Sequence, residues 1–160
     1  MEFTIRQMSP VDVDGITSAF GHRNKRREQY VRYFAEQQAG ERVTLVASSG
    51  GQVIGYTNVL WRSGYACFSE SDIPEINDLN VVEEFQNRGV GRALIREAER
   101  VVAARGKRSV GIGVGLTPDY GAAQHLYPQL GYVPDGRGIH STPYGDVVYF
   151  TKSLCGTASP

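Results

Sequence analysis

The strongest constraint on the fold is a passage from an apolar stretch through a glycine-marked turn into an amphipathic segment. Three of the four residues 79–82 are apolar, namely Leu79, Val81 and Val82, and a short polar loop follows. Gly89 and Gly91 then open a run with helical periodicity that stops at Gly106. Alternating glycines at the start and a glycine just past the end are typical of a helix bounded by a tight turn and a C-cap. The pattern therefore predicts a strand, a turn and a helix over residues 91–105.

This turn is a candidate phosphate site. The first N–H groups of a helix have no partner within it and carry the positive end of its dipole, which favours an anion. Gly89 and Gly91 leave room for close approach, and Arg88 and Arg92 add positive charge. No Gly-Lys-Ser/Thr is present, and Leu94 stands where a dinucleotide fingerprint needs a small residue, so neither nucleotide loop fits. The two glycines alone are equally compatible with a plain strand–helix turn.

The rest of the chain alternates strands and helices, which predicts one α/β layered domain over residues 1–160. Gly50-Gly51 indicates a hairpin turn, and residues 62–73 are expected to be a loop with strand character near Tyr65–Phe68. We expect strands over 2–6, 42–48, 52–61, 75–82, 109–117 and 146–154, and helices over 10–20, 24–38, 91–105 and 120–130.

Composition excludes several classes of protein. The 17 basic and 17 acidic residues balance, which argues against general nucleic-acid binding. No apolar run approaches the ~20 residues that cross a bilayer, and the N-terminus lacks the pattern of a signal peptide, so we expect a cytoplasmic protein without a membrane partner. Neither the two cysteines nor the three histidines have metal-ligand spacing, and we expect no metal: Cys67, Cys155, His22, His125 and His140.

Two spaced motifs resemble those of a known family. Gln86-Asn87-Arg88-Gly89-Val90-Gly91 follows a strand of type Leu-x-Val, and Ala123–Tyr132 contains a tyrosine four residues before Gly131-Tyr132. Both are similar to the signatures of the GNAT superfamily of acetyl-CoA-dependent N-acetyltransferases. The resemblance implies a three-layer α/β fold with a mixed, splayed central sheet flanked by helices, the splay lying between residues 75–82 and 109–117.

The resemblance also implies how the cosubstrate acetyl-CoA is held. In the family the Leu-x-Val strand hydrogen-bonds the pantetheine arm, and the loop amides hold the pyrophosphate. Tyr120 stands where the family often has a cofactor-contacting asparagine, which puts that contact in doubt. The cofactor-binding residues implied are Leu79, Asn80, Val81, Gln86, Asn87, Arg88, Gly89, Val90, Gly91 and Arg92, with Tyr120 at the substituted position.

The strand Val110–Leu116 supports a ligand site independently of the family. Every second residue is glycine, so one face is apolar and the other is bare backbone. Glycine weakens a strand and often marks close approach by a ligand or by another backbone. A cofactor or acceptor along that face and a tightly packed helix explain the pattern equally well.

Amide formation from a thioester needs a group that takes the proton of the amine and a donor for the leaving thiolate. The resemblance assigns the donor to Tyr127, whose phenol, with an ordinary pKa of roughly 10, is protonated at neutral pH. Simple packing is the alternative role. Pro128 follows it within the predicted helix and can kink that helix, which would re-aim the tyrosine.

The base is less specified. Some relatives carry a glutamate on the second central strand, where this chain has Gly115. Others use one near the start of the first central strand, where Glu75 lies. We favour Glu75, acting directly or through water; a solvated surface carboxylate is the alternative, and Asp119 is a further candidate. In a regular strand one face would carry Glu75, Asn77, Leu79 and Val81, with Asp78 pointing away.

These features predict an acetyltransferase acting on the primary amine of a small molecule in a ternary complex. A protein N-terminus or lysine is an alternative acceptor, and a non-catalytic acyl-CoA sensor is an alternative function. An acidic entrance or an aromatic pocket would suit a cationic amine, although a solvated loop and core packing explain the same residues. The candidates are Glu70, Asp72, Glu75 and Asp78, and Tyr30, Tyr33, Phe34 and Trp61. Whether two copies form a homodimer is open.

Overall fold

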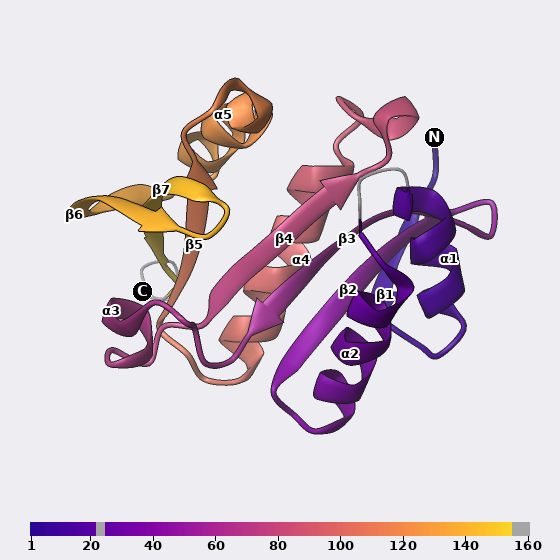
Figure 1. Cartoon of the computed structure of the whole chain (residues 1–160), viewed down its shortest axis with the longest axis horizontal. Helices are drawn as coiled ribbons and strands as arrows, with labels where there is room; N and C mark the ends of the chain where they lie inside the picture. The colour runs from indigo at the N-terminus through magenta and orange to yellow at the C-terminus, as the bar shows by residue number, and fades with distance from the viewer. Residues whose placement is uncertain (22–24, 155–160) are drawn as a thin grey trace, which may run out of the picture.

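The computed structural model describes residues 1–21 and 25–154 and has one seven-stranded sheet in the order β1-β2-β3-β4-β5-β7-β6 (Figure 1). His22 and Cys155 lie outside the described residues. The strands are β1 Thr4–Gln7, β2 Arg42–Ser49, β3 Gln52–Leu60, β4 Glu75–Val81, β5 Ser109–Gly115, β6 Val133–Thr142 and β7 Gly145–Ser153. The helices are α1 Asp12–Phe20, α2 Arg27–Gln38, α3 Ala66–Ser69, α4 Val90–Ala104 and α5 Gly121–Gln129, with 3-10 turns η2 Glu83–Phe85 and η3 Pro118–Tyr120.

Helices cover both faces of the sheet, which confirms the predicted three-layer α/β fold. α4 lies across one face and α1 and α2 lie on the other (Figure 1). The apolar stripe of α4 is buried at Val90, Leu94 and Ala98, against the inward residues of β2 to β5. A second cluster joins α1 and α2 to β3 through Phe20, Tyr30 and Tyr56. The predicted hairpin forms at Gly50 and Gly51, both with positive φ.

β4 departs from the regular strand that the sequence predicts. Asn77 and Asn80 oppose residues of β3 that are only two positions apart, so β4 carries one extra residue. Asp78 lies in this bulge with φ +60°, a backbone conformation that aspartate tolerates better than most residues. The bulge interrupts the alternation of the strand at its middle.

The predicted common face of β4 is therefore wrong beyond the bulge. Residues that oppose each other in an antiparallel pair share a face, and by this register Glu75, Asn77 and Asn80 lie on the α1/α2 face. Leu79 and Val81 lie on the α4 face, where they pack against the core. An inserted residue shifts every following side chain to the other face, because strand side chains alternate with a period of two.

The sheet opens between its two central strands. β4 and β5 run parallel, and the first two residues of β4 are the ones that pair, Glu75 with Gly111 and Ile76 with Ile112 of β5. Beyond these pairs the two strands diverge, as the gap between them in Figure 1 shows. All the other neighbouring strands are antiparallel. The splayed mixed sheet, which the resemblance implied for residues 75–82 and 109–117, is confirmed.

Three local predictions need correction. Residues 66–69 form the short helix α3, where we expected strand character near Tyr65–Phe68, and the helix expected from residue 120 begins at Gly121 after a 3-10 turn. β6 was not predicted, because Pro134, Gly136 and Gly138 interrupt its apolar alternation. In the part of the chain that is described, no helix is long and apolar enough to cross a bilayer.

Candidate functional site

The turn into α4 is shaped by two residues with positive φ, Asn87 at +61° and Gly89 at +86°. α4 begins at Val90, and Gly89 is its N-cap. The N–H of Ala93 makes the first backbone bond of the helix, to the Gly89 carbonyl oxygen at 3.0 Å, so the earlier amides of the turn have no helical acceptor. A Cβ placed on Gly89 would meet no atom within 4 Å, so the turn faces open space. These features fit an anion such as a diphosphate.

Side chains of the predicted loop brace the turn from several directions. Gln86 donates to the Val81 carbonyl oxygen at 3.0 Å and so ties the loop to the end of β4. Arg92 donates to Gln129 of α5 at 3.0 Å, and the guanidinium of the exposed Arg88 lies 5.7 Å from the Phe85 ring centroid. Gln86 and Arg92 therefore both have protein partners, and Arg88 contacts Met1 Sδ at 4.0 Å. The backbone amides of the turn are the groups best placed to face a ligand, with the exposed charge of Arg88 nearby.

The glycine face of β5 is covered by aromatic rings, which neither of the two explanations offered from the sequence had included. A Cβ on Gly111 would lie 2.2 Å from the Phe68 ring, and one on Gly113 would lie 3.0 Å from the ring of Tyr149. Because these glycines lack side chains, the two rings lie directly on the strand. Phe68 comes from α3 and Tyr149 from β7, so the rings bring two separate segments onto one strand.

Tyr120 occupies the last part of this face. A Cβ on Gly115 would lie 2.4 Å from the Tyr120 ring, which is 43% exposed. Gly115 stands where some relatives carry a glutamate, and here the tyrosine ring fills that space. Asp119, the further candidate base, is exposed beside it. The sequence left the role of Tyr120 in doubt, and the structure places its ring against β5.

Tyr127 lies in the core on the α4 side of the sheet and is only 4% exposed. Its nearest aromatic neighbour is Tyr132, with ring centroids 6.0 Å apart. Within residues 1–21 and 25–154 its hydroxyl makes no hydrogen bond, and burial raises its pKa well above the ordinary value. The phenol is thus protonated and unpaired. Pro128 lies in the last turn of α5, which continues through Gln129.

Glu75 lies at the closed end of the gap, where β4 still pairs with β5. It is partly buried, and Ser63 donates to its carboxylate at 2.5 Å. Burial raises the pKa of this carboxyl, while the hydrogen bonds from Ser63 and Asn77 act in the opposite direction. The solvated surface carboxylate considered from the sequence is therefore ruled out, and a partly desolvated carboxylate with a raised pKa suits a proton acceptor.

Asp78 is a second, half-buried carboxylate, whose partners the sequence did not predict. Lys25 pairs with it, the hydroxyls of Tyr33 and Tyr56 donate to it at 2.8 and 2.9 Å, and Asn80 donates at 2.8 Å. Burial raises the pKa of Asp78, but the charge and hydrogen bond of Lys25 and the two phenols outweigh this and lower it overall. The bulge in β4 directs Asp78 toward these partners, and no local pattern in the sequence signals a bulge.

The predicted acidic entrance does not form as one surface. Glu70 is exposed, and Asp72 pairs with Lys107 at 2.8 Å. Glu75 and Asp78 are each enclosed by separate partners. Of the aromatic candidates, Tyr30 and Tyr33 belong to the cluster around Tyr56. Trp61 packs on the α4 side beneath the guanidinium of Arg105. These three side chains therefore pack in the core or contribute to the Asp78 cluster.

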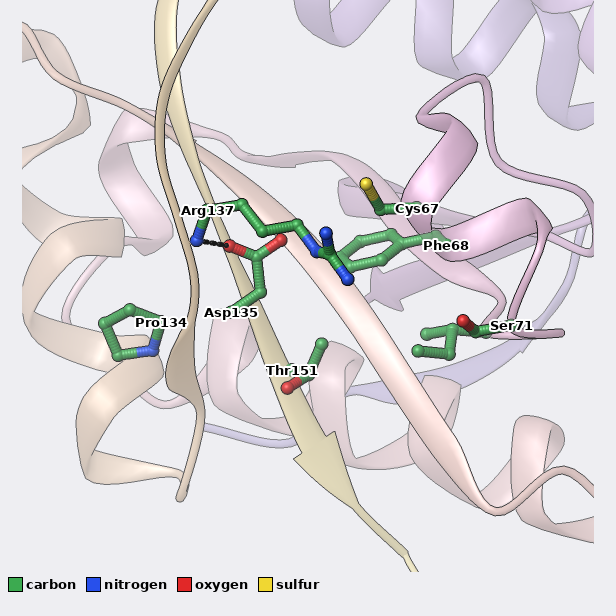
Figure 2. Close-up of a pocket in the computed structure, with 8 residues that line it drawn as sticks. Cys67, Phe68, Ser71, Pro134, Asp135, Arg137 and Thr151 are labelled. Atoms are coloured by element: carbon green, nitrogen blue, oxygen red, sulfur yellow. Dashed lines mark hydrogen bonds between the residues drawn. The ribbon is translucent and has the colours of Figure 1, made fainter.

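Figure 2 shows a pocket lined by residues of α3 and of the β6–β7 hairpin. Phe68 forms one wall, and Asp135 and Arg137 of β6 lie across from it, with Cys67 at the rim. Among the described residues no group of three or more potential metal ligands gathers, in this pocket or elsewhere. The pocket is distinct from the α4 turn and carries none of the predicted cofactor residues.

The structure assembles the predicted residues around the gap from opposite faces. By its register Glu75 belongs to the α1/α2 face, and Tyr127 belongs to the core on the α4 face. Leu79, Val81 and Leu126 surround Gly91 on the α4 face, each 3.8 to 3.9 Å from the position of its absent Cβ. Through Leu126, the part of α5 that carries Tyr127 therefore lies beside the start of α4.

Comparisons with known proteins agree with this geometry. A family model described as the acetyltransferase (GNAT) family matches residues 14–132. An uncharacterized N-acetyltransferase of Chlorobaculum tepidum is 38% identical over 65 residues, a stretch that takes in 41% of this chain and 37% of that protein.

Solved structures share the fold at low sequence identity. An N-acetyltransferase from Staphylococcus aureus Mu50 superposes with a TM-score of 0.77 at 14% identity, covering 96% of this chain and 99% of that one. The PaiA N-acetyltransferase from Thermoplasma acidophilum, in complex with coenzyme A, superposes with a TM-score of 0.70 at 16% identity, covering 96% and 99%.

Proposed function

Because this chain belongs to the acetyltransferase (GNAT) family, we propose that it transfers the acetyl group of acetyl-CoA to a primary amine within a single domain of residues 1–160. The observation that carries this proposal is the position of the α4 turn relative to the splay. β4 and β5 separate beyond Ile76 and Ile112, and β4 runs from that point toward the turn at Gly89. A long ligand with a diphosphate at one end and a thioester at the other fits that arrangement.

The fit depends on backbone groups more than on side chains. The amides before Ala93 and the dipole of a 15-residue helix would hold the diphosphate, with Arg88 adding charge. The backbone of Leu79–Val81, which is not paired with β5, would hydrogen-bond the pantetheine arm. Tyr120, over Gly115, would border the same gap.

Acetyl-CoA, when bound, supplies an activated acyl group as a thioester. As the amine nitrogen bonds to the carbonyl carbon and the carbon–sulfur bond breaks, one proton leaves the nitrogen and one reaches the sulfur. We assign acceptance of the first proton to Glu75, directly or through one water, and donation of the second to the Tyr127 hydroxyl. Their positions on opposite faces of the sheet suit this division, because the two protons are transferred at two different substituents of the reacting carbon, the amine nitrogen and the sulfur.

We propose a small-molecule amine as the acceptor. The side of the gap that bears Glu75 is closed off by α3, by the aromatic rings over β5 and by the Asp78 cluster, all built from side chains that pack closely. An enclosed wall of this kind suits a small ligand better than an extended peptide. A protein N-terminus or lysine is the other acceptor class, and an acyl-CoA sensor without turnover is the alternative function.

Release of thiol from acetyl-CoA, followed across a panel of small amines and of peptides with free N-termini and lysines, tests the proposal. We expect turnover with at least one small amine and little with peptides. Turnover with peptides alone would show that the acceptor is a protein N-terminus or lysine and not a small-molecule amine. Binding of CoA by calorimetry without turnover on any amine would favour the sensor, and the absence of binding at millimolar coenzyme would refute the assignment of the α4 turn.

A further inference from the structure

Ser63 lies in the turn between β3 and α3 and is 4% exposed. Its Oγ is 2.5 Å from a carboxylate oxygen of Glu75 and 2.9 Å from the backbone nitrogen of Tyr65. The Tyr65 N–H can only donate, so the serine oxygen must accept that bond. The hydroxyl proton is then left for Glu75, and the direction of the Ser63–Glu75 bond is fixed: the serine donates and the carboxylate accepts.

We propose that Ser63 is a positioning residue that keeps the Glu75 carboxylate ionised and fixed in orientation, ready to take a proton. This inference rests on the proposed role of Glu75 as the base. A hydrogen bond donated to the charged form of a carboxyl favours that form, and such charge-assisted bonds are stronger than bonds between neutral groups. Ser63 is not a relay, because beyond its oxygen lies only a backbone N–H that cannot accept a proton.

The groups that donate hydrogen bonds to the Glu75 carboxylate are neutral. Asn77, on the same strand face, is the other donor, and Tyr149 of β7 faces the carboxylate and has its own pKa raised, first by burial and then by the charge of Glu75. Asp135 is the next charged group and adds to the effect on Tyr149. Within residues 1–21 and 25–154 no lysine, arginine or histidine forms an ion pair with Glu75.

The turn that carries Ser63 is held rigidly by Tyr65. The Tyr65 ring stacks on Tyr149 with centroids 3.8 Å apart, and its hydroxyl donates to Asp135 at 2.7 Å and lies 3.3 Å from the ring nitrogen of His140. Tyr65 thus fixes the serine through its backbone and the neighbouring β6–β7 hairpin through its side chain. This arrangement gives the serine hydroxyl one orientation, which a flexible surface turn would not.

Ser63→Ala tests the inference through the pH dependence of kcat/KM. The activity rises with pH as the base loses its proton, so removing the donor should move this rise to higher pH, by about one pH unit. We expect the rate of the variant to approach that of the parent protein at high pH and its affinity for coenzyme A to stay unchanged. Ser63→Thr keeps the hydroxyl and should restore the parent profile. Ser69→Ala, which removes a hydroxyl bonded only to Ala66 of its own helix, is the matched control.

A second measurement does not depend on turnover. In the coenzyme-free protein with carbon-13 at the Glu carboxyls, the Glu75 resonance, assigned with Glu75→Gln, should titrate at higher pH in Ser63→Ala. Glu75→Gln should also abolish the rise of the activity profile, and a profile that survives this change would refute the base itself. A lost rise in Glu75→Gln together with unshifted titrations in Ser63→Ala would overturn only the role of Ser63.

Discussion

The two ends of the gap between β4 and β5 present different chemical groups: backbone amides at the open end and side chains at the closed end. At the open end the turn into α4 offers backbone amides, two residues with positive φ and space where Gly89 has no Cβ. At the closed end Glu75 is surrounded by side chains: Ser63 donates a hydrogen bond to its carboxylate, and Tyr149 lies near enough to interact with its charge. The α4 turn can bind an anion through its backbone amides, whichever side chains it carries. At the closed end, in contrast, the charge and orientation of the Glu75 carboxylate depend on each neighbouring side chain.

This difference implies a division of labour between binding and chemistry. The backbone end should set the affinity for the coenzyme, because amides and a helix dipole act on a fixed diphosphate before and during the reaction alike. The side-chain end should set the rate, because a proton acceptor matters only as the bond forms. Variants at each end should therefore change different kinetic quantities.

Gly89→Asp should have the largest effect. The carboxylate would enter the space in front of the turn, where its charge opposes a diphosphate at a few ångströms, and we expect coenzyme affinity to fall several hundredfold, about 3–4 kcal/mol. Aspartate tolerates positive φ, so the cost in folding stability should be small. Calorimetry with coenzyme A measures the change.

Gly106→Asp is the matched control for that variant. Gly106 follows the other end of α4, has φ +83° against +86° for Gly89, and likewise has no atom within 4 Å of an added Cβ. The two substitutions therefore share side chain and backbone strain and differ in location. Unchanged affinity in Gly89→Asp, or equal losses in both variants, would show that the turn does not hold the coenzyme.

Tyr127→Phe should have the next largest effect, and on rate instead of affinity. Loss of the donor to the thiolate should lower kcat by about a hundredfold, ~2.7 kcal/mol, at nearly constant coenzyme affinity. Stability should hardly change, since the hydroxyl makes no hydrogen bond in the described part of the chain. Steady-state kinetics and thermal unfolding of the same variant separate the two effects.

Tyr132→Phe should have the opposite effect: it should lower stability and leave the rate unchanged. Tyr132 is as deeply buried as Tyr127, but its hydroxyl donates to Glu99 at 2.8 Å, and Glu99 also pairs with Lys152 at 3.0 Å. Its loss should lower the free energy of unfolding by about 1–3 kcal/mol and leave kcat intact. If Tyr127→Phe lowers stability and spares kcat, Tyr127 is a packing residue and the acid must be sought elsewhere.

The two ends also differ in how far the sequence predicts them. The α4 turn is a local pattern: glycines, an apolar strand before them and an amphipathic run after them all lie within residues 79–106, so the turn, the helix and the direction of the amides follow from neighbouring residues. The hairpin at Gly50-Gly51 was predicted for the same reason. Local periodicity and glycine placement suffice wherever the backbone itself makes the structure.

The closed end could not be predicted in this way. Ser63 meets Glu75 only because α3 and its turn fold back over β5, and the rings of Phe68 and Tyr149 reach the glycines of β5 from two other segments. The alternating glycines indicated a close approach to that strand, but they did not identify the approaching group as aromatic rings. The bulge at Asp78 left no mark in the apolar alternation, so the faces of Leu79 and Val81 were assigned wrongly.

Asp78 and Asp72 allow the effect of enclosure to be measured at fixed backbone geometry. Both have positive φ, +60° and +55°, and both pair with a lysine, Lys25 and Lys107. Their side chains are 18% and 73% exposed, respectively. Asparagine tolerates the same φ, so Asp78→Asn and Asp72→Asn both remove charge with little backbone strain.

Asp78→Asn should lower the free energy of unfolding at pH 7 by about 1–2 kcal/mol, because Lys25 loses its partner and the phenols of Tyr33 and Tyr56 lose a charged acceptor. Asp72→Asn should stay within about 0.5 kcal/mol, as expected for an exposed pair. The folded-state pKa of Asp78 lies below the ordinary 3.8, so its stabilisation is complete above that value and is lost as pH falls through the folded pKa. The free energies of urea unfolding of the parent protein and of Asp78→Asn should therefore differ most near neutral pH and converge as pH falls below the folded-state pKa of Asp78. A difference that persists in acid would mean that packing, not charge, stabilises the cluster.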